Sequence, residues 1–123
     1  MSRAALAVDL QGREETFTGP VRAACRAAGI GSLLHIRRAA DGRLPENTAT
    51  FTAAVDQICR AWLDARLPEP ARTGHHALFL SGPTAIALAL GARLANVQPD
   101  RWTIYNYDGA SSTYEPFPRS RQL

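Results

Sequence analysis

Short apolar runs alternate along the chain with longer segments of helical periodicity. Four of these runs have the length, the polar boundaries and the β-branched or aromatic content that are typical of strands. They are Ala4–Leu10, Ser32–Arg37, His76–Leu80 and Trp102–Tyr107. The first and third are almost wholly apolar, which predicts strands that are buried on both faces.

Three helices are expected between these strands. The first is predicted to begin at Pro20 and to make its last turn over Arg26–Ala28, with Gly29 as the residue that follows the helix. The second begins at Thr48, with Asn47 or Thr48 as its cap. Its apolar residues recur at spacings of four, three and four and form one face: Phe51, Val55, Ile58 and Trp62.

The third helix is predicted over Thr84–Ala95, directly after the turn Ser81-Gly82-Pro83. Pro83 suits the first helical position, because its φ is already helical and its missing N–H would be unpaired there, and Ser81 or Gly82 then serves as the cap. The helix has almost no polar face. We therefore expect it to be covered on most sides by other parts of the protein.

This order, β-α-β-α-β-α-β, predicts an α/β fold with a Rossmann-like parallel sheet in a single lobe. Crossovers of this kind join parallel strands and are nearly always right-handed. We place the lobe at residues 1–109 and treat residues 110–123 as a C-terminal tail. Its serines, threonine and prolines are compatible with a last extended segment or with a loosely ordered one.

Composition restricts the class of protein. A chain of 123 residues with 46% hydrophobic and 20% charged residues is expected to form one ordinary globular domain. The longest apolar region is interrupted by Ser81-Gly82-Pro83 and Gly91, so no membrane span and no membrane partner are expected. Cys25 and Cys59 lie in helical patterns without CxxC spacing and without a preceding signal peptide, which favours buried thiols in a cytoplasmic protein.

The net charge is +3, and all 14 basic residues are arginine. The planar guanidinium group suits contacts with phosphates and bases. The arginines are nevertheless scattered, apart from Arg37-Arg38 and Arg119 with Arg121, so a surface for duplex nucleic acid is not expected.

The candidate ligand site lies in the loops that follow the first and third strands. In an open parallel sheet these loops meet at the carboxyl edge, where helix amides and hydroxyls hold anionic groups. The alternative for the second loop is that it only ends a strand and begins a helix, and Asp9 has the alternative role of capping its own loop. The candidate residues in the two loops are Asp9, Gln11, Gly12, Arg13, Ser81, Gly82, Pro83 and Thr84.

No catalytic, metal or cofactor site is predicted. The chain contains neither GxGxxG nor GxxxxGK[ST], and Ser81 lacks a GxSxG context. His75 and His76 are adjacent in a strand, so their side chains point to opposite faces and do not readily bind one ion. His35 has no partner nearby in the sequence and is expected to be half-buried.

The C-terminal part of the chain resembles the C-terminal signature of SAVED domains. The similarity is carried by the strand Leu78–Leu80, the turn Ser81-Gly82-Pro83 and the Ala/Leu-rich helix with Gly91, Leu94 and Asn96. A strand with Ile104 and Tyr105 and a closing element with Tyr114 and Pro116 complete it. The chain departs from the family at Asn106, where an acidic residue is usual. The resemblance covers about the last 45 residues.

This resemblance implies a CARF-like lobe that senses a cyclic oligonucleotide, with no cofactor, in antiphage defence of the CBASS or CRISPR type. A ligand of the cyclic oligoadenylate class would stack a base on an aromatic residue such as Tyr107, although core packing is the alternative for that side chain. SAVED domains resemble two such lobes fused to an effector. A single lobe is therefore expected to form a homo-oligomer or to join a separately encoded lobe or effector chain. The alternatives are a ring nuclease that cleaves the messenger and a structural subunit without a ligand.

Overall fold

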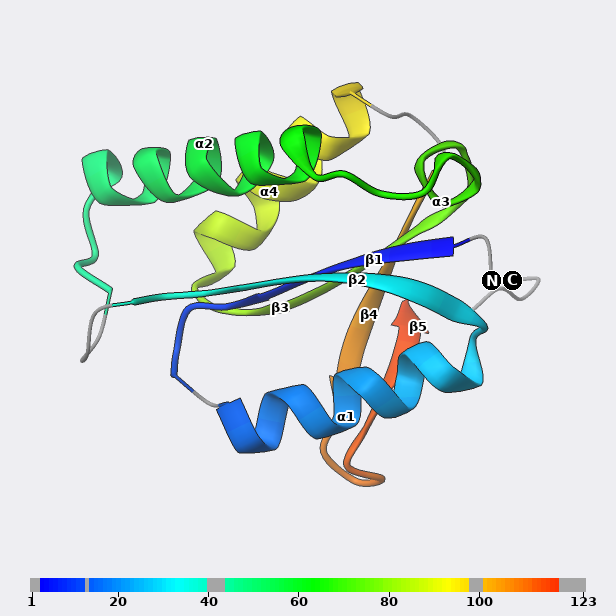
Figure 1. The fold of residues 1–123 in the computed structure, drawn as a ribbon. Coiled ribbons are helices and arrows are strands. Elements are labelled where there is room, and N and C mark those ends of the chain that lie inside the picture. Colours follow the sequence, from blue (N-terminus) through cyan, green and yellow to red (C-terminus); the bar gives the residue numbers. More distant parts are fainter. Residues whose placement is uncertain (1–2, 13, 40–43, 98–100, 118–123) are drawn as a thin grey trace, which may run out of the picture.

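Five strands form one sheet in the order β2-β1-β3-β4-β5 (Figure 1). The structure is a computed structural model that describes residues 3–12, 14–39, 44–97 and 101–117. The first four strands are parallel, and β5 pairs antiparallel with β4. Their bounds are Arg3–Asp9 for β1, Ile30–Arg37 for β2, His76–Ser81 for β3, Trp102–Asp108 for β4 and Thr113–Phe117 for β5.

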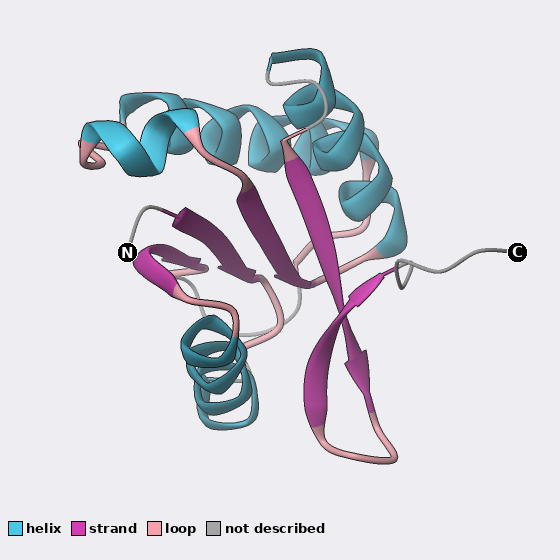
Figure 2. Ribbon diagram, turned by 90° about the vertical axis from the view of Figure 1, so that its right-hand side faces the viewer, coloured by secondary structure: helices cyan, strands magenta, loops and turns pink. Residues whose placement is uncertain are grey.

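Helices cover both faces of the sheet. They are α1 (Glu14–Ala27), α2 (Thr48–Asp64), the short α3 (Glu69–Thr73) and α4 (Thr84–Val97). α1 lies on one face, whereas α2 and α4 lie side by side on the other (Figures 1 and 2). The expected α/β, Rossmann-like architecture in a single lobe is therefore confirmed.

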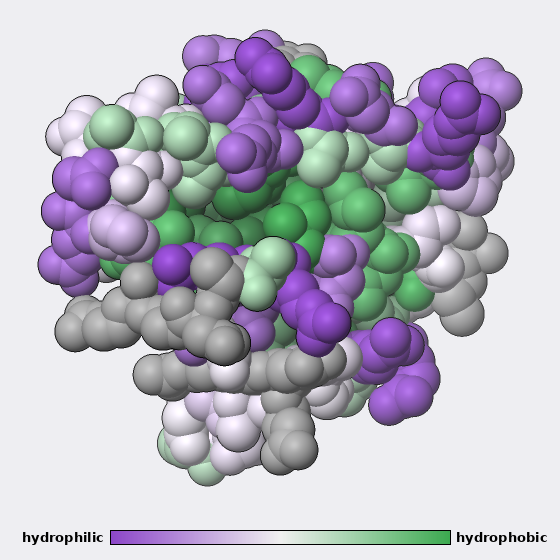
Figure 3. Space-filling model, turned by 60° about the vertical axis from the view of Figure 1, so that its left-hand side comes forward, coloured by the Kyte–Doolittle hydropathy of each residue, from purple (hydrophilic) through white to green (hydrophobic). Residues whose placement is uncertain are grey.

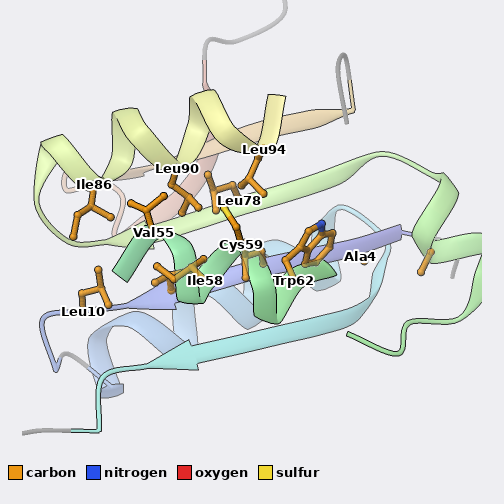
Figure 4. Close-up of a cluster of buried hydrophobic side chains, with 13 residues drawn as sticks. Ala4, Leu10, Val55, Ile58, Cys59, Trp62, Leu78, Ile86, Leu90 and Leu94 are labelled. Atoms are coloured by element: carbon orange, nitrogen blue, oxygen red, sulfur yellow. The ribbon is translucent and has the colours of Figure 1, made fainter. Parts of the chain in front are cut away.

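The central strand β1 is buried on both faces because its side chains alternate between two hydrophobic clusters. Ala4, Leu6 and Val8 belong to the cluster beneath α2 and α4, and Ala5 and Ala7 to the cluster beneath α1. In the first cluster, residues from α2 and α4 meet residues from β1 and β3 (Figure 4). The predicted apolar face of α2 supplies Val55, Ile58 and Trp62, which are all buried, and Phe51, which is partly buried.

The predicted start of the first helix at Pro20 is wrong. α1 begins at Glu14, and Pro20 lies inside it. A proline in a helix interior lacks an N–H donor and costs about 3 kcal/mol relative to alanine. Burial of Phe17, Val21 and Cys25 at spacings of four outweighs this cost, because all three pack on the same face of the sheet. Gly29 follows the helix with φ of +70°, as its predicted position requires.

The expectation that Thr84–Ala95 is covered on most sides is also wrong. Ile86, Leu90 and Leu94 are buried, but Leu88 on the outer face is 71% exposed. Exposed alanines surround Leu88. The outer face of α4 therefore consists of apolar residues but lies outside the core.

The C-terminal tail contains a strand. β5 pairs with β4 from Asp108↔Thr113 to Ile104↔Phe117, and Ser112 in the connecting turn has φ of 54°. Residues 113–117 are therefore joined to the sheet by strand pairing, and residues 118–123 of the predicted tail lie outside the described part of the chain.

Candidate functional site at the carboxyl edge of the sheet

The strand order changes direction between β1 and β3. From β1 the chain crosses one face through α1 to reach β2, whereas from β3 it crosses the other face through α4 to reach β4. The loops after β1 and β3 therefore leave the sheet on opposite faces. In open α/β sheets, ligands bind in the crevice that such a divergence leaves at the carboxyl ends of the strands.

The two loops contact each other directly. The Leu10 amide donates to the Ser81 carbonyl oxygen at 2.8 Å, and the Ser81 hydroxyl donates to Gln11 Oε1 at 2.8 Å. Gly82 also lies close to Leu10, since a Cβ atom at position 82 would be 3.2 Å from Leu10 Cδ1. The structure thus brings together the predicted residues Gln11, Ser81 and Gly82 from segments about 70 positions apart.

Asp9 shapes the first of these loops. Its side chain is buried with 2% of its surface exposed, and its Oδ1 accepts a hydrogen bond from the Gln11 amide at 3.1 Å. Gly12, which directly follows Gln11, has φ of +67°, a conformation that residues with a Cβ atom rarely adopt. The geometry thus favours the loop-capping role for Asp9.

A row of polar side chains crosses three strands at this edge. Arg37 of β2 and Ser81 of β3 are the register partners of Asp9 in β1. Alternation along each strand directs all three toward the α1 face, because Ala7, His35 and Phe79 two residues earlier pack there. The Asp9 carbonyl oxygen also accepts from the Arg38 amide at 3.1 Å.

Arg37 and Arg38 were not among the predicted site residues. Their position at the end of a strand is visible in the sequence, but their place beside Asp9 depends on which strands are neighbours in the sheet. They bring positive charge to an edge that already contains a buried carboxyl group.

The opposite side of the same edge is apolar. Alternation turns Leu10, Ile36 and Leu80 toward α2 and α4, where Phe51 in the first turn of α2 and Leu44 join them. Figure 3, which brings the carboxyl ends of the strands forward, shows a hydrophobic hollow below the helices on this side. This apolar wall was not predicted, because the strand and helix residues in it had been assigned only to the core.

The amino end of α4 adjoins this edge. The Ile86 and Ala87 amides both donate to the Pro83 carbonyl oxygen at 3.1 Å. The amides of Thr84 and Ala85 therefore precede the first bonds of the helix and are placed to meet an anion. Pro83 stands just before the first helical residue, one position earlier than expected.

Tyr107 lies away from the other predicted site residues. The pairing of β3 with β4 runs only to Leu78↔Ile104, and beyond it β4 continues as a ribbon with β5. Tyr107 is 43% exposed and contacts Tyr114 with their ring centroids 5.3 Å apart. Arg13, which was also predicted for the site, lies outside the described residues.

The two described cysteine thiols are not activated by their surroundings. Burial raises the pKa of the Cys25 thiol, and it does the same for Cys59, so both thiols are held in the protonated form. His75 is exposed just before β3, and His76 is buried as the first residue of β3, at the end away from this edge. Within residues 3–12, 14–39, 44–97 and 101–117, no three His, Cys, Asp or Glu residues gather as a metal site.

Comparison of the chain with protein-family models, curated proteins and solved structures found no match. Two observations bear on the function: the geometry of the carboxyl edge and the resemblance of the sequence to SAVED domains. Among the described helices, none has the length and apolar character needed to cross a membrane.

Proposed function

We propose that the carboxyl edge between β1 and β3 binds a small ligand that combines an anionic group with a flat apolar part. The observation that carries this proposal is the division of one edge into two chemical halves. Arg37 and the first amides of α4 supply donors, while Ile36, Leu80 and Phe51 supply an apolar wall. A small number of well-placed polar groups beside apolar walls is typical of small-molecule sites.

A nucleotide has both of these parts. Its phosphate matches the guanidinium group and the helix amides, and its base matches the apolar wall. The resemblance to SAVED domains narrows the ligand to a cyclic oligonucleotide, with cyclic oligoadenylates as the first candidates. The protein would then be a sensor or a sensor subunit in antiphage defence.

Such a sensor acts through the assembly that it forms. A ligand shifts an equilibrium between free and assembled states only by the difference in its affinity for the two. The partner in this proposal is a second copy of the chain or a separate lobe or effector. Binding of the messenger between partners would favour the assembled state.

The test is a thermal-shift screen against cyclic di-, tri- and tetranucleotides. A ligand at about one hundred times its dissociation constant adds about 2.7 kcal/mol of stability. This corresponds to a rise of several degrees in the melting temperature for a domain of this size. Each hit is then incubated with the protein and examined for linear products, which would identify a ring nuclease instead of a sensor.

Two pairs of variants connect a hit with this edge. Arg37→Ala removes a guanidinium group from the site and is expected to abolish the shift, while Arg60→Ala, on the exposed side of α2, leaves it unchanged. Thr84→Pro removes one amide donor at a position that tolerates proline, and Thr84→Ala keeps that donor. Equal shifts in all four variants would place the ligand elsewhere, and no shift with any nucleotide would favour a structural subunit without a ligand.

A further inference from the structure

The outer edge of β2 is an unprotected strand edge from Ser32 on, because the irregularity in its register with β1 lies before that residue. β2 has eight residues and is the terminal strand of the sheet, with β1 as its one partner among the described strands. It contains no proline, and no charged residue precedes Arg37 at its end. Ser32, Leu33, Leu34, His35 and Ile36 are all partly exposed, whereas the corresponding residues of β1 are buried. Such an edge presents unpaired backbone donors and acceptors to another strand.

The opposite edge of the sheet is protected. β5 has five residues and includes Glu115 and Pro116. A short strand, a charged side chain and a proline are the usual means of preventing a strand edge from pairing. Of the two outer strands of this sheet, β5 has features that prevent pairing, and β2 lacks the same features.

The helix above this edge leaves room for a neighbour. Asp56 of α2 faces α4, where it pairs with Arg93. On the opposite side of α2, helical periodicity places Ala54 and Ala61, which are both partly exposed. Side chains of this size do not screen the strand below them.

We infer that β2 pairs antiparallel with β2 of a second copy of this chain, so that one sheet runs through both molecules. A copy carries a net charge of +3, so a contact between two copies is least opposed where the contact segment adds no charge of its own. Ile30–Ile36 is uncharged when its histidine is neutral, and it has an aliphatic residue on each face, Leu33 on one and Leu34 on the other. A two-fold axis makes the same segment the partner of itself, as an isologous interface requires.

The faces of the sheet restrict the register. Leu33 and His35 face α1, and Leu34 and Ile36 face α2 and α4. Directly opposed residues of two antiparallel strands lie on the same face of the sheet. With a two-fold axis perpendicular to the sheet, this requires that one residue of β2 pairs with the same residue of the second copy. With the axis at Leu34, Ser32 opposes Ile36, and with the axis at Leu33, Ser32 opposes Leu34. Either register buries leucines around the axis.

The first test measures molecular mass by light scattering at micromolar to submillimolar concentrations, without any ligand. The wild type is expected to dimerise. Ser32→Lys places two like charges near the axis and is expected to weaken association about tenfold or more. Thr113→Lys is the matched control, because it adds the same charge to the protected edge on β5, and it is expected to leave the dimer unchanged. Melting temperatures verify that both variants are folded.

The second test replaces single residues of β2 by cysteine and oxidises the dimer. Directly opposed residues of an antiparallel pair have Cα atoms about 4.5 or 5.5 Å apart, within the range of about 4.4–6.8 Å that a disulfide spans. Leu33→Cys or Leu34→Cys is therefore expected to cross-link efficiently, and Thr113→Cys is not. The two native cysteines are buried, and cross-linking of the wild type under the same oxidation measures their contribution.

Three results would overturn the inference. The first is a wild-type protein that remains monomeric throughout the concentration range. The second is a dimer that persists in Ser32→Lys and dissociates in Leu88→Lys, which would move the interface to the exposed face of α4. The third is cross-linking no stronger at Leu33 and Leu34 than at Thr113. None of these results depends on the proposed ligand.

Discussion

His76 is an ionisable residue in an environment that disfavours its charge. It has no exposed surface, and its ring lies 5.0 Å from the rings of Trp62 and Trp102, measured between centroids. Burial lowers the pKa of His76, the charge of Arg101 lowers it further, and the nearby Arg72 backbone acts weakly in the opposite direction. Neither ring nitrogen has a hydrogen-bond partner among the described residues. A neutral ring is therefore part of the folded state.

This predicts a loss of stability in mild acid. Above about pH 6.5 the ring is neutral in both the folded and the unfolded state. As the pH falls below this value, the unfolded chain binds a proton first, so the free energy of unfolding decreases by at most about 1.4 kcal/mol per pH unit. Denaturant titrations between pH 7.5 and 5 should show a steeper decrease in the wild type than in His76→Leu. His75→Leu, at the exposed neighbour, should retain the wild-type slope, and equal slopes in all three would contradict the account.

Asp9 gives a second prediction at the scale of single residues. Its buried Oδ1 accepts from the Gln11 amide, and an unpaired buried donor costs about 1–3 kcal/mol. Asp9→Ala should therefore reduce the free energy of unfolding by about this amount. Asp9→Asn keeps an acceptor at the same place and should be less destabilising. If the two variants were equally stable in urea titrations, Asp9 would not be the residue that holds this loop.

At the scale of elements, α1 shows where local sequence rules fail. Pro20 looked like a helix start because its backbone suits that position, but the buried face formed by Phe17, Val21 and Cys25 extends the helix before it. Pro20→Ala restores the missing donor and should stabilise the protein by up to about 3 kcal/mol. Gly19→Ala, the preceding residue, should give about 0.5–1 kcal/mol. Destabilisation by Pro20→Ala in denaturant titrations would contradict this description of α1.

The two faces of α4 give another test at this scale. Leu90 is buried and Leu88 is exposed, although the sequence around them is apolar throughout. Leu90→Ala should cost about 2–5 kcal/mol, and Leu88→Ala should cost little. Comparable losses in the two variants would show that another surface covers Leu88 in solution.

Much of the fold could be predicted because its signals are local. The spacing of Val55, Ile58 and Trp62 specifies α2, Gly29 ends α1 in the left-handed conformation, and the apolar run from His76 specifies β3. β5 was predicted only as one of two alternatives, an extended segment or a loosely ordered one, because Pro116 is unusual in a strand and is tolerated only at an edge. α4 was misjudged because composition alone does not separate a covered apolar face from an exposed one.

The candidate site was predicted only in part. The loops with Gln11 and Ser81 follow from the rule that ligands bind at the carboxyl ends of parallel strands. Two placements depend on strand order and register, which no short segment encodes: Arg37 beside Asp9, and Ile36 and Leu80 on either side of Val8. Tyr107 was included for its aromatic ring, but the β4–β5 ribbon holds it apart from β3.

At the scale of the whole molecule, the sheet carries two distinct features. Its carboxyl edge between β1 and β3 combines donors with an apolar wall, and its outer strand β2 offers a surface for a second copy. Arg37 at the end of β2 belongs to the first feature and borders the second. Antiparallel pairing of two β2 strands would therefore place two such carboxyl edges at opposite ends of one continuous sheet.

The central claim is that the loops after β1 and β3 form a ligand site, and an amide-resolved NMR titration tests it most directly. The protein, labelled with ¹⁵N, is titrated with each cyclic nucleotide of the panel. We predict that the amide signals of Gln11, Gly12, Thr84 and Ala85 shift progressively and saturate with one of them. Shifts confined to the opposite end of the sheet, around His76 and Trp102, would contradict the claim, as would unchanged spectra with every nucleotide.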